Sequence, residues 1–338
     1  DYTDLRQQLL DGEQPIGCSQ CWNNEKNNVK SKRQNDAYVY RDNIFDIDYN
    51  DTKTSKLVSL DIKINKTCNL SCRMCGPAFS SKWANEVSQH KESYPQFSLL
   101  SLVKNEWTDI NGSKVWKDLE EITSDLLYLT FSGGEPLLDK THSSMLQYFI
   151  NKQRSSYISL HYNTNATIFA SNLIPLWSCF KEVELSFSID NTGKKFEYER
   201  YGVSWKTIVD TIEKYKKVTD TVLNLNVWST ITTLNILDTY TLFQFCREYG
   251  LPISFNLVND PKQLNICLFN KKQKKYITDK LLNIQDNEFQ KIIEPIITAM
   301  NSSNMSTNTT NMIDFLSITD KIRKQDYKQT YEELTYIL

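Results

Sequence analysis

The sequence has few of the features that mark an unusual protein class. It contains nine glycines, eight prolines and three histidines among 338 residues, and no run of about 18 apolar residues. Without such a run, a transmembrane helix is excluded and no membrane partner is expected. Basic and acidic side chains number 39 and 41, so charge does not indicate nucleic acid as a partner. With 40% hydrophobic and 24% charged residues, the composition is that of a soluble globular protein.

The eight cysteines are too few for a disulfide scaffold at this length, and their spacing is uneven. Cys18 and Cys21 form one group, and Cys68, Cys72 and Cys75 form another. In a chain without a signal peptide, such groups indicate metal ligands in a reducing compartment, so we expect a cytoplasmic protein. The isolated cysteines should be small buried hydrophobic residues; they are Cys179, Cys246 and Cys267.

From Leu57 onward, short apolar runs alternate with helical patterns, which predicts an α/β fold with a parallel sheet of right-handed βαβ units. The predicted strands are Leu57–Ile64, Leu126–Phe131, Tyr157–Tyr162, Val183–Ile189, Val222–Ile231 and Ile253–Val258. The helices predicted between them are Ser80–His90, Lys140–Gln153, Ser204–Val218 and Leu237–Tyr249. Three more helices are predicted to follow, at Lys274–Ile284, Glu288–Met300 and Met312–Arg323. Active sites of such sheets lie at the carboxyl ends of the strands.

The first predicted strand runs into a loop with the spacing C-x3-C-x2-C, formed by Cys68, Cys72 and Cys75. Three thiolates so spaced can hold three corners of a cubane iron-sulfur cluster and leave the fourth iron without a protein ligand. A zinc site that lacks its fourth ligand, or three structural cysteines, would give the same spacing. The nearest histidine is His90, on the following helix.

The second predicted strand ends in Gly133-Gly134-Glu135-Pro136. Because neither glycine has a Cβ, a ligand could lie against the backbone there, and Glu135 could accept a hydrogen bond from an ammonium group. A plain turn would also explain this motif. One βα crossover separates it from the cysteine loop, so we expect both motifs on the same rim of the sheet.

Together the two motifs resemble those of radical S-adenosylmethionine (SAM) enzymes, over about residues 56 to 260. The resemblance implies a partial (βα)6 TIM-like barrel with a helical C-terminal extension. It also implies that Cys68, Cys72 and Cys75 bind a [4Fe-4S] cluster, whose open iron binds SAM. The strand end from Gly133 to Pro136 would then contact the methionine amino group of SAM, and Met74 would cover the adenine or the cluster.

Three later residues match the family's SAM contacts less closely. Asn165 stands where many members have Thr-Asn-Gly, although Ala166 replaces the usual glycine. Ser188 and Arg200 resemble the residues that hold the SAM carboxylate in peptide-modifying members, a task that suits a guanidinium group. For Arg200, a surface ion pair with Glu197 or Glu199 is the alternative.

Cys18 and Cys21 resemble part of an auxiliary cluster region of SPASM or twitch type. Two cysteines cannot complete a four-ligand site, and the chain begins at Asp1 without a methionine, so we expect the remaining ligands upstream. Half of a zinc site or a redox-active dithiol are the alternatives. The predicted domains are residues 1–55 as the remnant of this region, 56–262 as the radical SAM core and 263–338 as the helical extension.

The resemblance implies reductive cleavage of SAM to a 5′-deoxyadenosyl radical that takes hydrogen from a substrate. It favours a peptide or protein substrate over a small molecule, a one-electron donor such as flavodoxin or ferredoxin, and a second, auxiliary [4Fe-4S] cluster. The alternatives are an activase that installs a glycyl radical on a partner, and a non-catalytic scaffold that binds an iron-sulfur cluster or zinc.

Overall fold

The computed structural model describes residues 2–26, 31–40, 57–63, 65–95, 123–139, 141–218, 222–302 and 309–338. The chain divides into two compact units. Unit 1 comprises residues 1–58 and 118–126, and unit 2 comprises residues 59–117 and 127–338. Unit 2 therefore contains both the predicted core and the predicted C-terminal extension. The domain boundaries after residues 55 and 262 stay predictions, and residues 41–55 lie outside the described part.

Unit 1 begins with three short helices and a 3-10 turn. They are α1 (Tyr2–Leu10), η1 (Ile16–Cys18), α2 (Ser19–Lys26) and α3 (Lys32–Val39). Ser31 caps α3 in a capping box with Gln34, which satisfies two backbone donors at the start of the helix. No hydrophobic side chain is buried among the described residues before residue 59. These helices therefore have no hydrophobic core among their described residues.

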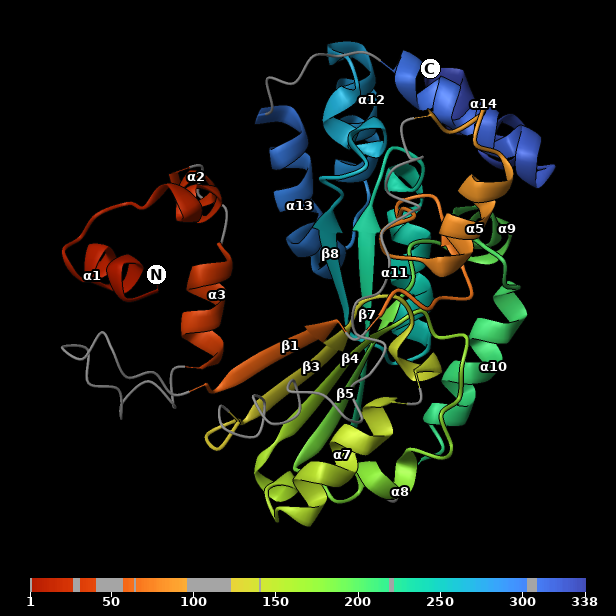
Figure 1. The fold of residues 1–338 in the computed structure, drawn as a ribbon. Helices are drawn as coiled ribbons and strands as arrows, with labels where there is room; N and C mark the ends of the chain where they lie inside the picture. The colour runs from red at the N-terminus through yellow and green to blue at the C-terminus, as the bar shows by residue number, and fades with distance from the viewer. Residues whose placement is uncertain are drawn as a thin grey trace. The chain divides into compact units, whose positions relative to one another are not determined.

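A sheet of six parallel strands forms the centre of unit 2, and it confirms the predicted α/β fold (Figure 1). The strands are β1 (Ser59–Lys63), β3 (Tyr128–Ser132), β4 (Ser159–Thr164), β5 (Glu182–Ser188), β7 (Leu223–Ile231) and β8 (Ile253–Leu257). They are ordered as in the chain, with no reversal. Right-handed crossovers between neighbours in such an order all return on the same side of the sheet.

Side chains alternate between the two faces of this sheet. One row of register partners is apolar, with Ile62, Phe131, Tyr162, Leu185 and Leu225. The adjacent row on the other face is polar, with Asp61, Thr130, His161, Glu184 and Asn224. The apolar face therefore packs against helices, while the polar face carries hydrogen-bonding and titratable groups.

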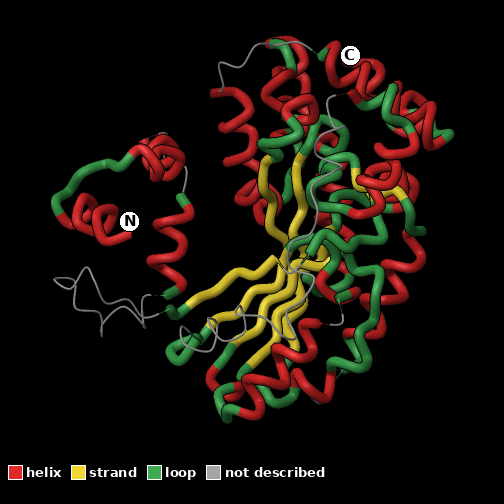
Figure 2. The backbone as a smooth tube through the Cα atoms, in the orientation of Figure 1, coloured by secondary structure: helices red, strands yellow, loops and turns green. Residues whose placement is uncertain are grey.

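Four helices between the strands lie where the sequence predicts them: α5 (Ser81–Gln89), α7 (Thr141–Asn151), α10 (Trp205–Tyr215) and α11 (Thr239–Glu248). Two shorter helices, α8 (Ile174–Trp177) and α9 (Gly193–Glu199), were not predicted. Figure 2 shows these helices following the sheet along its length. In α10, Ile208, Ile212 and Tyr215 are buried at helical spacing, which explains why this segment forms an amphipathic helix.

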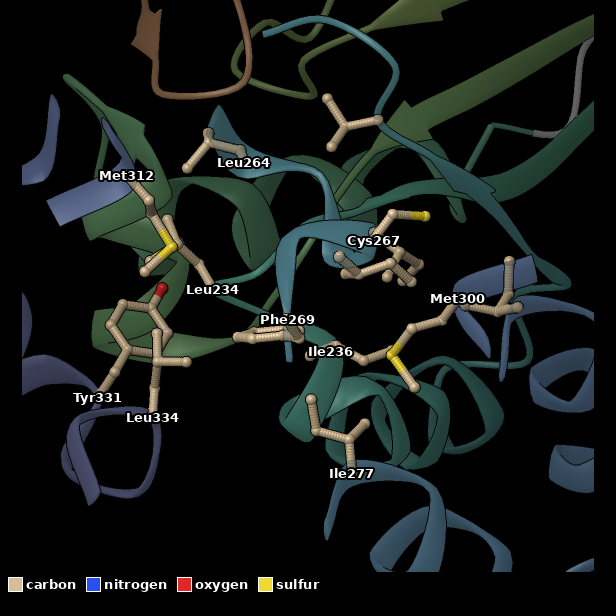
Figure 3. Packing of buried hydrophobic residues seen from close by; sticks show 14 of the residues in the cluster. Leu234, Ile236, Leu264, Cys267, Phe269, Ile277, Met300, Met312, Tyr331 and Leu334 are labelled. Atoms are coloured by element: carbon tan, nitrogen blue, oxygen red, sulfur yellow. The ribbon is translucent and has the colours of Figure 1, made fainter. Parts of the chain in front are cut away.

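The C-terminal part of unit 2 is helical, as predicted. Its helices are α12 (Lys271–Leu282), α13 (Asn287–Ser302), α14 (Thr310–Arg323), α15 (Tyr327–Thr330) and α16 (Glu332–Ile337). Their buried side chains belong to the same hydrophobic cluster as Trp83 of α5 and Ile231 of β7. Figure 3 shows part of this cluster, from Leu234 to Leu334. The C-terminal helices are thus packed onto the sheet and the first crossover helix.

The isolated cysteines follow the prediction in two of three cases. Cys246 and Cys267 are buried, as expected for small hydrophobic residues. The prediction for Cys179 is wrong, because it is exposed just beyond the four-residue helix α8, where its thiol donates to the carbonyl of Pro175. In the described part of the chain, no helix is both long and apolar enough to span a bilayer.

Candidate functional site

The three cysteines of the C-x3-C-x2-C motif lie in the loop that follows β1. Cys72 is in the two-residue strand β2 (Ser71–Cys72), which pairs antiparallel with β6 (Arg200–Tyr201). The Cys75 amide donates to the carbonyl of Cys72 at 3.0 Å, so the second and third cysteines are joined by a tight turn. Cys72 is buried, while Cys68 and Cys75 are partly exposed.

This loop is docked onto the end of β3. The amides of Gly134 and Glu135 donate to the carbonyls of Asn65 and Thr67, at 3.2 and 2.7 Å. A Cβ on Gly134 would lie 2.2 Å from the Thr67 oxygen, and one on Gly133 would lie 2.8 Å from the Asn65 oxygen. Gly133 also has a φ of +117°, which side-chain-bearing residues avoid.

The two glycines have a role that the sequence does not predict. The backbone of the chain's own cysteine loop lies against them. Contact of Gly133, Gly134 and Pro136 with a cofactor stays a prediction, while their contribution to the position of the loop is a property of the fold.

Glu135 is 1% exposed, and its carboxylate joins the ends of β3 and β4. It accepts hydrogen bonds from the Thr164 hydroxyl at 2.7 Å, the Asn165 amide at 2.6 Å and the Leu137 amide at 3.1 Å. Burial raises the pKa of Glu135 to about 7, and these three donors oppose the rise. Since a carboxylate offers about four acceptor positions, about one is left for a ligand.

Asn165, at the end of β4, connects that strand to the cysteine loop. Its side-chain amide donates to Asn69 Oδ1 at 2.9 Å and lies 3.8 Å from the sulfur of Cys68. Ala166, which replaces the family's usual glycine, has a φ of +59°. The backbone therefore keeps the left-handed conformation that glycine favours, although alanine stands there.

Arg200 is buried on the opposite side of the loop, and the alternative of a surface ion pair with Glu197 or Glu199 is wrong. Its guanidinium pairs with Asp190 at 2.7 Å and directs Nη1 to the sulfur of Cys72 at 3.8 Å. Although desolvation opposes protonation, the carboxylate of Asp190 raises the pKa of Arg200 above its ordinary value. The second oxygen of Asp190 accepts from the Thr230 amide at 2.7 Å, so the pair is fixed from β7.

Ser188, the third residue predicted to contact SAM, is the last residue of β5 and lies in register with Trp228 of β7. Its side chain makes no hydrogen bond within the described residues. The contacts described above bring together Cys68, Cys72, Cys75, Glu135, Asn165 and Arg200, whereas Ser188 is placed only by its strand end.

The three free thiols form a donor set of the kind that holds iron-sulfur clusters. Burial raises the pKa of Cys72 to about 12 and that of Cys75 to about 11, and the neighbouring thiols contribute to both shifts. Among the described residues, no group of three cysteine, histidine or acidic side chains is placed to hold a metal ion. Binding of a cubane or of zinc by these cysteines stays a prediction.

A cavity of about 450 Å³ opens beside the last cysteine of the motif. Met74 and Cys75 form one wall, Asp260 and Pro261 after β8 form another, and Phe315 of α14 belongs to the third. This volume lies in the range of small-molecule sites.

The sequence interpretation missed Asp190 and Asn69, although both contact predicted site residues. Asp190 carries a signal that could have been used, because an acidic residue directly after a buried strand faces the carboxyl rim of the sheet. Asn69 lies within the C-x3-C spacing, and nothing in the sequence distinguishes it from the other polar residues there.

Cys18 and Cys21 lie in unit 1, at the end of η1 and in the first turn of α2. Both are partly exposed free thiols. No third metal-binding side chain joins them among the residues that the structure describes. An auxiliary cluster at this position therefore stays a prediction.

Comparisons with known proteins give partial similarities. Searches of protein-family models and of curated proteins found no match. Among solved structures, the chain is similar to native anSMEcpe with bound AdoMet, with 18% identity and a TM-score of 0.48 over 66% of this chain and 59% of that chain. It is also similar to Streptococcus suis SuiB bound to precursor peptide SuiA, with 16% identity and a TM-score of 0.46 over 75% of this chain and 53% of that chain. The chain thus spans little more than half of each, and these similarities do not assign it to a family.

Proposed function

We propose that unit 2 is a radical SAM enzyme whose sheet is a partial (βα)6 barrel. The strand order supports the barrel, because six parallel strands in chain order form a single wound layer. One observation carries the proposed activity: the C-x3-C-x2-C loop is docked on the Gly133–Pro136 strand end, with nitrogen donors aimed at two of its sulfurs.

In this proposal Cys68, Cys72 and Cys75 hold three irons of a [4Fe-4S] cluster. Once bound, the cluster would pass one electron to SAM, whose bond between sulfur and C5′ breaks to give methionine and a 5′-deoxyadenosyl radical that takes a substrate hydrogen. Arg200 places a buried positive charge beside Cys72 and so favours the thiolate that metal binding requires. Asn165 donates toward Cys68, the kind of contact that tunes cluster potentials.

The cavity beside Cys75 is the proposed site for the adenosine half of SAM. Met74, Phe315 and Ile318 give it apolar surface, and its volume suits a group of this size. The methionine half of SAM would lie against the strand end formed by Gly133, Gly134, Glu135 and Pro136. The free acceptor position of Glu135 would accept a hydrogen bond from its ammonium group. Ser188 and Arg200 would face the SAM carboxylate. The substrate proposed from the sequence resemblance is a peptide or protein, and the electron donor is a flavodoxin or ferredoxin.

The experiment is anaerobic reconstitution with iron and sulfide, then incubation with SAM and dithionite and an assay for 5′-deoxyadenosine. Cys72→Ala should lose the visible cluster absorbance and the product, while Cys179→Ala, at an exposed cysteine outside the loop, should keep both. A loaded cluster without 5′-deoxyadenosine would favour the non-catalytic scaffold. Retained cubane absorbance in Cys72→Ala would refute the ligand assignment.

The proposal extends to an auxiliary cluster in which Cys18 and Cys21 are two of the ligands. Its test is a count of iron and sulfide per chain after reconstitution of the protein. More than one cubane per chain, reduced to one by Cys21→Ala, is the expected result. A single cubane that Cys21→Ala leaves unchanged would exclude this second site.

A further inference from the structure

Arg73, one of the two residues between the second and third cysteines, makes its contacts outside the cysteine loop. Arg73 is fully buried, and its guanidinium pairs with Asp320 of α14 at 2.6 Å. It stacks over the ring of Tyr198, with 3.4 Å between the guanidinium carbon and the ring centre, and donates to Gln325 at 3.2 Å. The turn that joins Cys72 to Cys75 is therefore held by residues almost 250 positions later in the chain.

Both carboxylate oxygens of Asp320 accept hydrogen bonds. Oδ1 accepts from Arg73 and from the Tyr198 hydroxyl at 2.7 Å, and Oδ2 accepts from the Tyr327 amide at 2.7 Å. The chain reverses between α14 and α15 at Lys324, whose φ is +54°. One carboxylate thus ties the cysteine turn, the end of α9 and the start of α15 together.

A second contact holds the strand that pairs with Cys72. The Tyr331 hydroxyl donates to Glu199 at 2.7 Å, and the rings of Tyr331 and Tyr198 meet edge to face at 5.4 Å. Glu199 directly precedes Arg200, whose Nη1 points at the sulfur of Cys72. Figure 3 shows Tyr331 within the hydrophobic cluster, beside Leu334. Residues Asp320–Tyr331 therefore hold both partners of the short β2–β6 ladder.

Stability alone does not account for a buried ion pair at this place. Apolar side chains of similar volume often replace such pairs without loss of stability, because desolvation of two charges offsets their attraction. An ion pair with further hydrogen bonds does fix direction and distance better than apolar packing, since each bond has a preferred geometry.

We propose that Asp320–Tyr331 is a clamp that positions Cys72 and Cys75, with Asp320 as its main positioning residue. The clamp is a property of the metal-free chain, while its consequence for a cluster rests on the proposed function. Without the clamp, the Cys72–Cys75 turn should open independently of the rest of unit 2.

The test is hydrogen exchange of the metal-free full chain, followed by mass spectrometry of peptides. The amides of Arg73 and Cys75 are the reporters, because they donate to Glu199 and Cys72 in the closed turn. In Asp320→Asn they should exchange about tenfold faster or more, since Arg73 loses its charged partner. Peptides from α7 report global unfolding, and Asp279→Asn, at an exposed ion pair on α12, is the matched control.

Tyr331→Phe is the second variant, because it removes only the hydroxyl that donates to Glu199 and keeps the ring. It should speed exchange at Arg73 by a smaller factor than Asp320→Asn. Unchanged exchange in both variants, or equal acceleration in α7, would overturn the clamp. After reconstitution at limiting iron, Asp320→Asn should hold less iron than Asp279→Asn. Faster exchange in a protein that never binds a cubane would leave the clamp standing and reject the proposed function.

Discussion

The contact between Gly134 and the cysteine loop gives a prediction whose size follows from the structure. In Gly134→Ala, the new Cβ would lie 2.2 Å from the Thr67 oxygen and 2.7 Å from two backbone carbons of the loop. Ordinary contacts begin near 3.4 Å, so the loop backbone would have to retreat by about 1.2 Å. That movement would stretch the 2.7 Å hydrogen bond from Glu135 to Thr67 beyond hydrogen-bonding distance.

Overpacking of this kind costs about 1–3 kcal/mol, and loss of the hydrogen bond adds about 1 kcal/mol. We therefore expect Gly134→Ala to lower the free energy of unfolding by about 2–4 kcal/mol. With an unfolding entropy of about 2.1 cal/mol/K per residue, the melting temperature should fall by about 3–6 °C. The assay is thermal and urea unfolding of the metal-free chain, followed by circular dichroism.

The matched control is Gly76→Ala, which makes the same substitution within the cysteine loop itself. A Cβ at Gly76 has no neighbour within 4 Å, so the free energy of unfolding should change by less than about 0.5 kcal/mol. If both variants are equally stable, the close approach of the loop to Gly134 does not hold the loop in place, and this reasoning is refuted.

Three further predictions concern buried polar groups and cysteines. Burial raises the pKa of Glu199 from 4.5 to about 8, so between these values the folded chain retains a proton that the unfolded chain releases. The free energy of unfolding should therefore fall as pH rises through this window. In Glu199→Gln, the slope of the free energy of unfolding against pH, measured by urea unfolding, should be flatter. An equal slope in both proteins would contradict this. Arg200→Met leaves Asp190 buried without its partner and should lower the free energy of unfolding by about 3–5 kcal/mol. The control is Lys206→Met, at the exposed pair with Asp210, which should change it by less than about 0.5 kcal/mol. Cys246→Ser buries a hydroxyl and should lower the free energy of unfolding by about 1–3 kcal/mol, whereas Cys179→Ser should leave it unchanged in the same assay. Equal effects would mean that the two sites do not differ in burial.

The six strands of the sheet and the longer helices were predictable because each has a local signal, whereas the short elements β2, β6, α8 and α9 were not predicted. In β5, Val183, Leu185 and Phe187 face the apolar side while Glu184 and Ser186 face the polar side, and this alternation is visible in the sequence. The helices show the 3.6-residue period in the same way. Whether the sheet closes toward a barrel depends on twist and on strand stagger, which no short window of sequence records.

The partners of the site residues were less predictable, since they depend on tertiary contacts. Arg200 was given Glu199 as a possible partner because the two are adjacent in sequence. In the structure, however, Glu199 ends helix α9 and accepts from Tyr331, whereas Arg200 begins β6 and faces Asp190 and Cys72. Sequence distance therefore misled the choice of an ion-pair partner for Arg200, and the expected contact of Arg200 with the SAM carboxylate stays a prediction.

The glycine pair at the end of β3 shows why motif variants need two measurements. A motif can be sensitive to substitution because it binds a cofactor, or because it positions the loop that binds the cofactor. The structure shows the second cause for Gly134, since the cysteine loop lies against it. Loss of activity in Gly134→Ala would then follow from a displaced loop, even if the residue never touched SAM. Glu135 is subject to the same ambiguity, since its carboxylate already joins β3 to β4. A binding role for either residue is established only by a variant that keeps the stability of the metal-free chain and loses affinity for SAM.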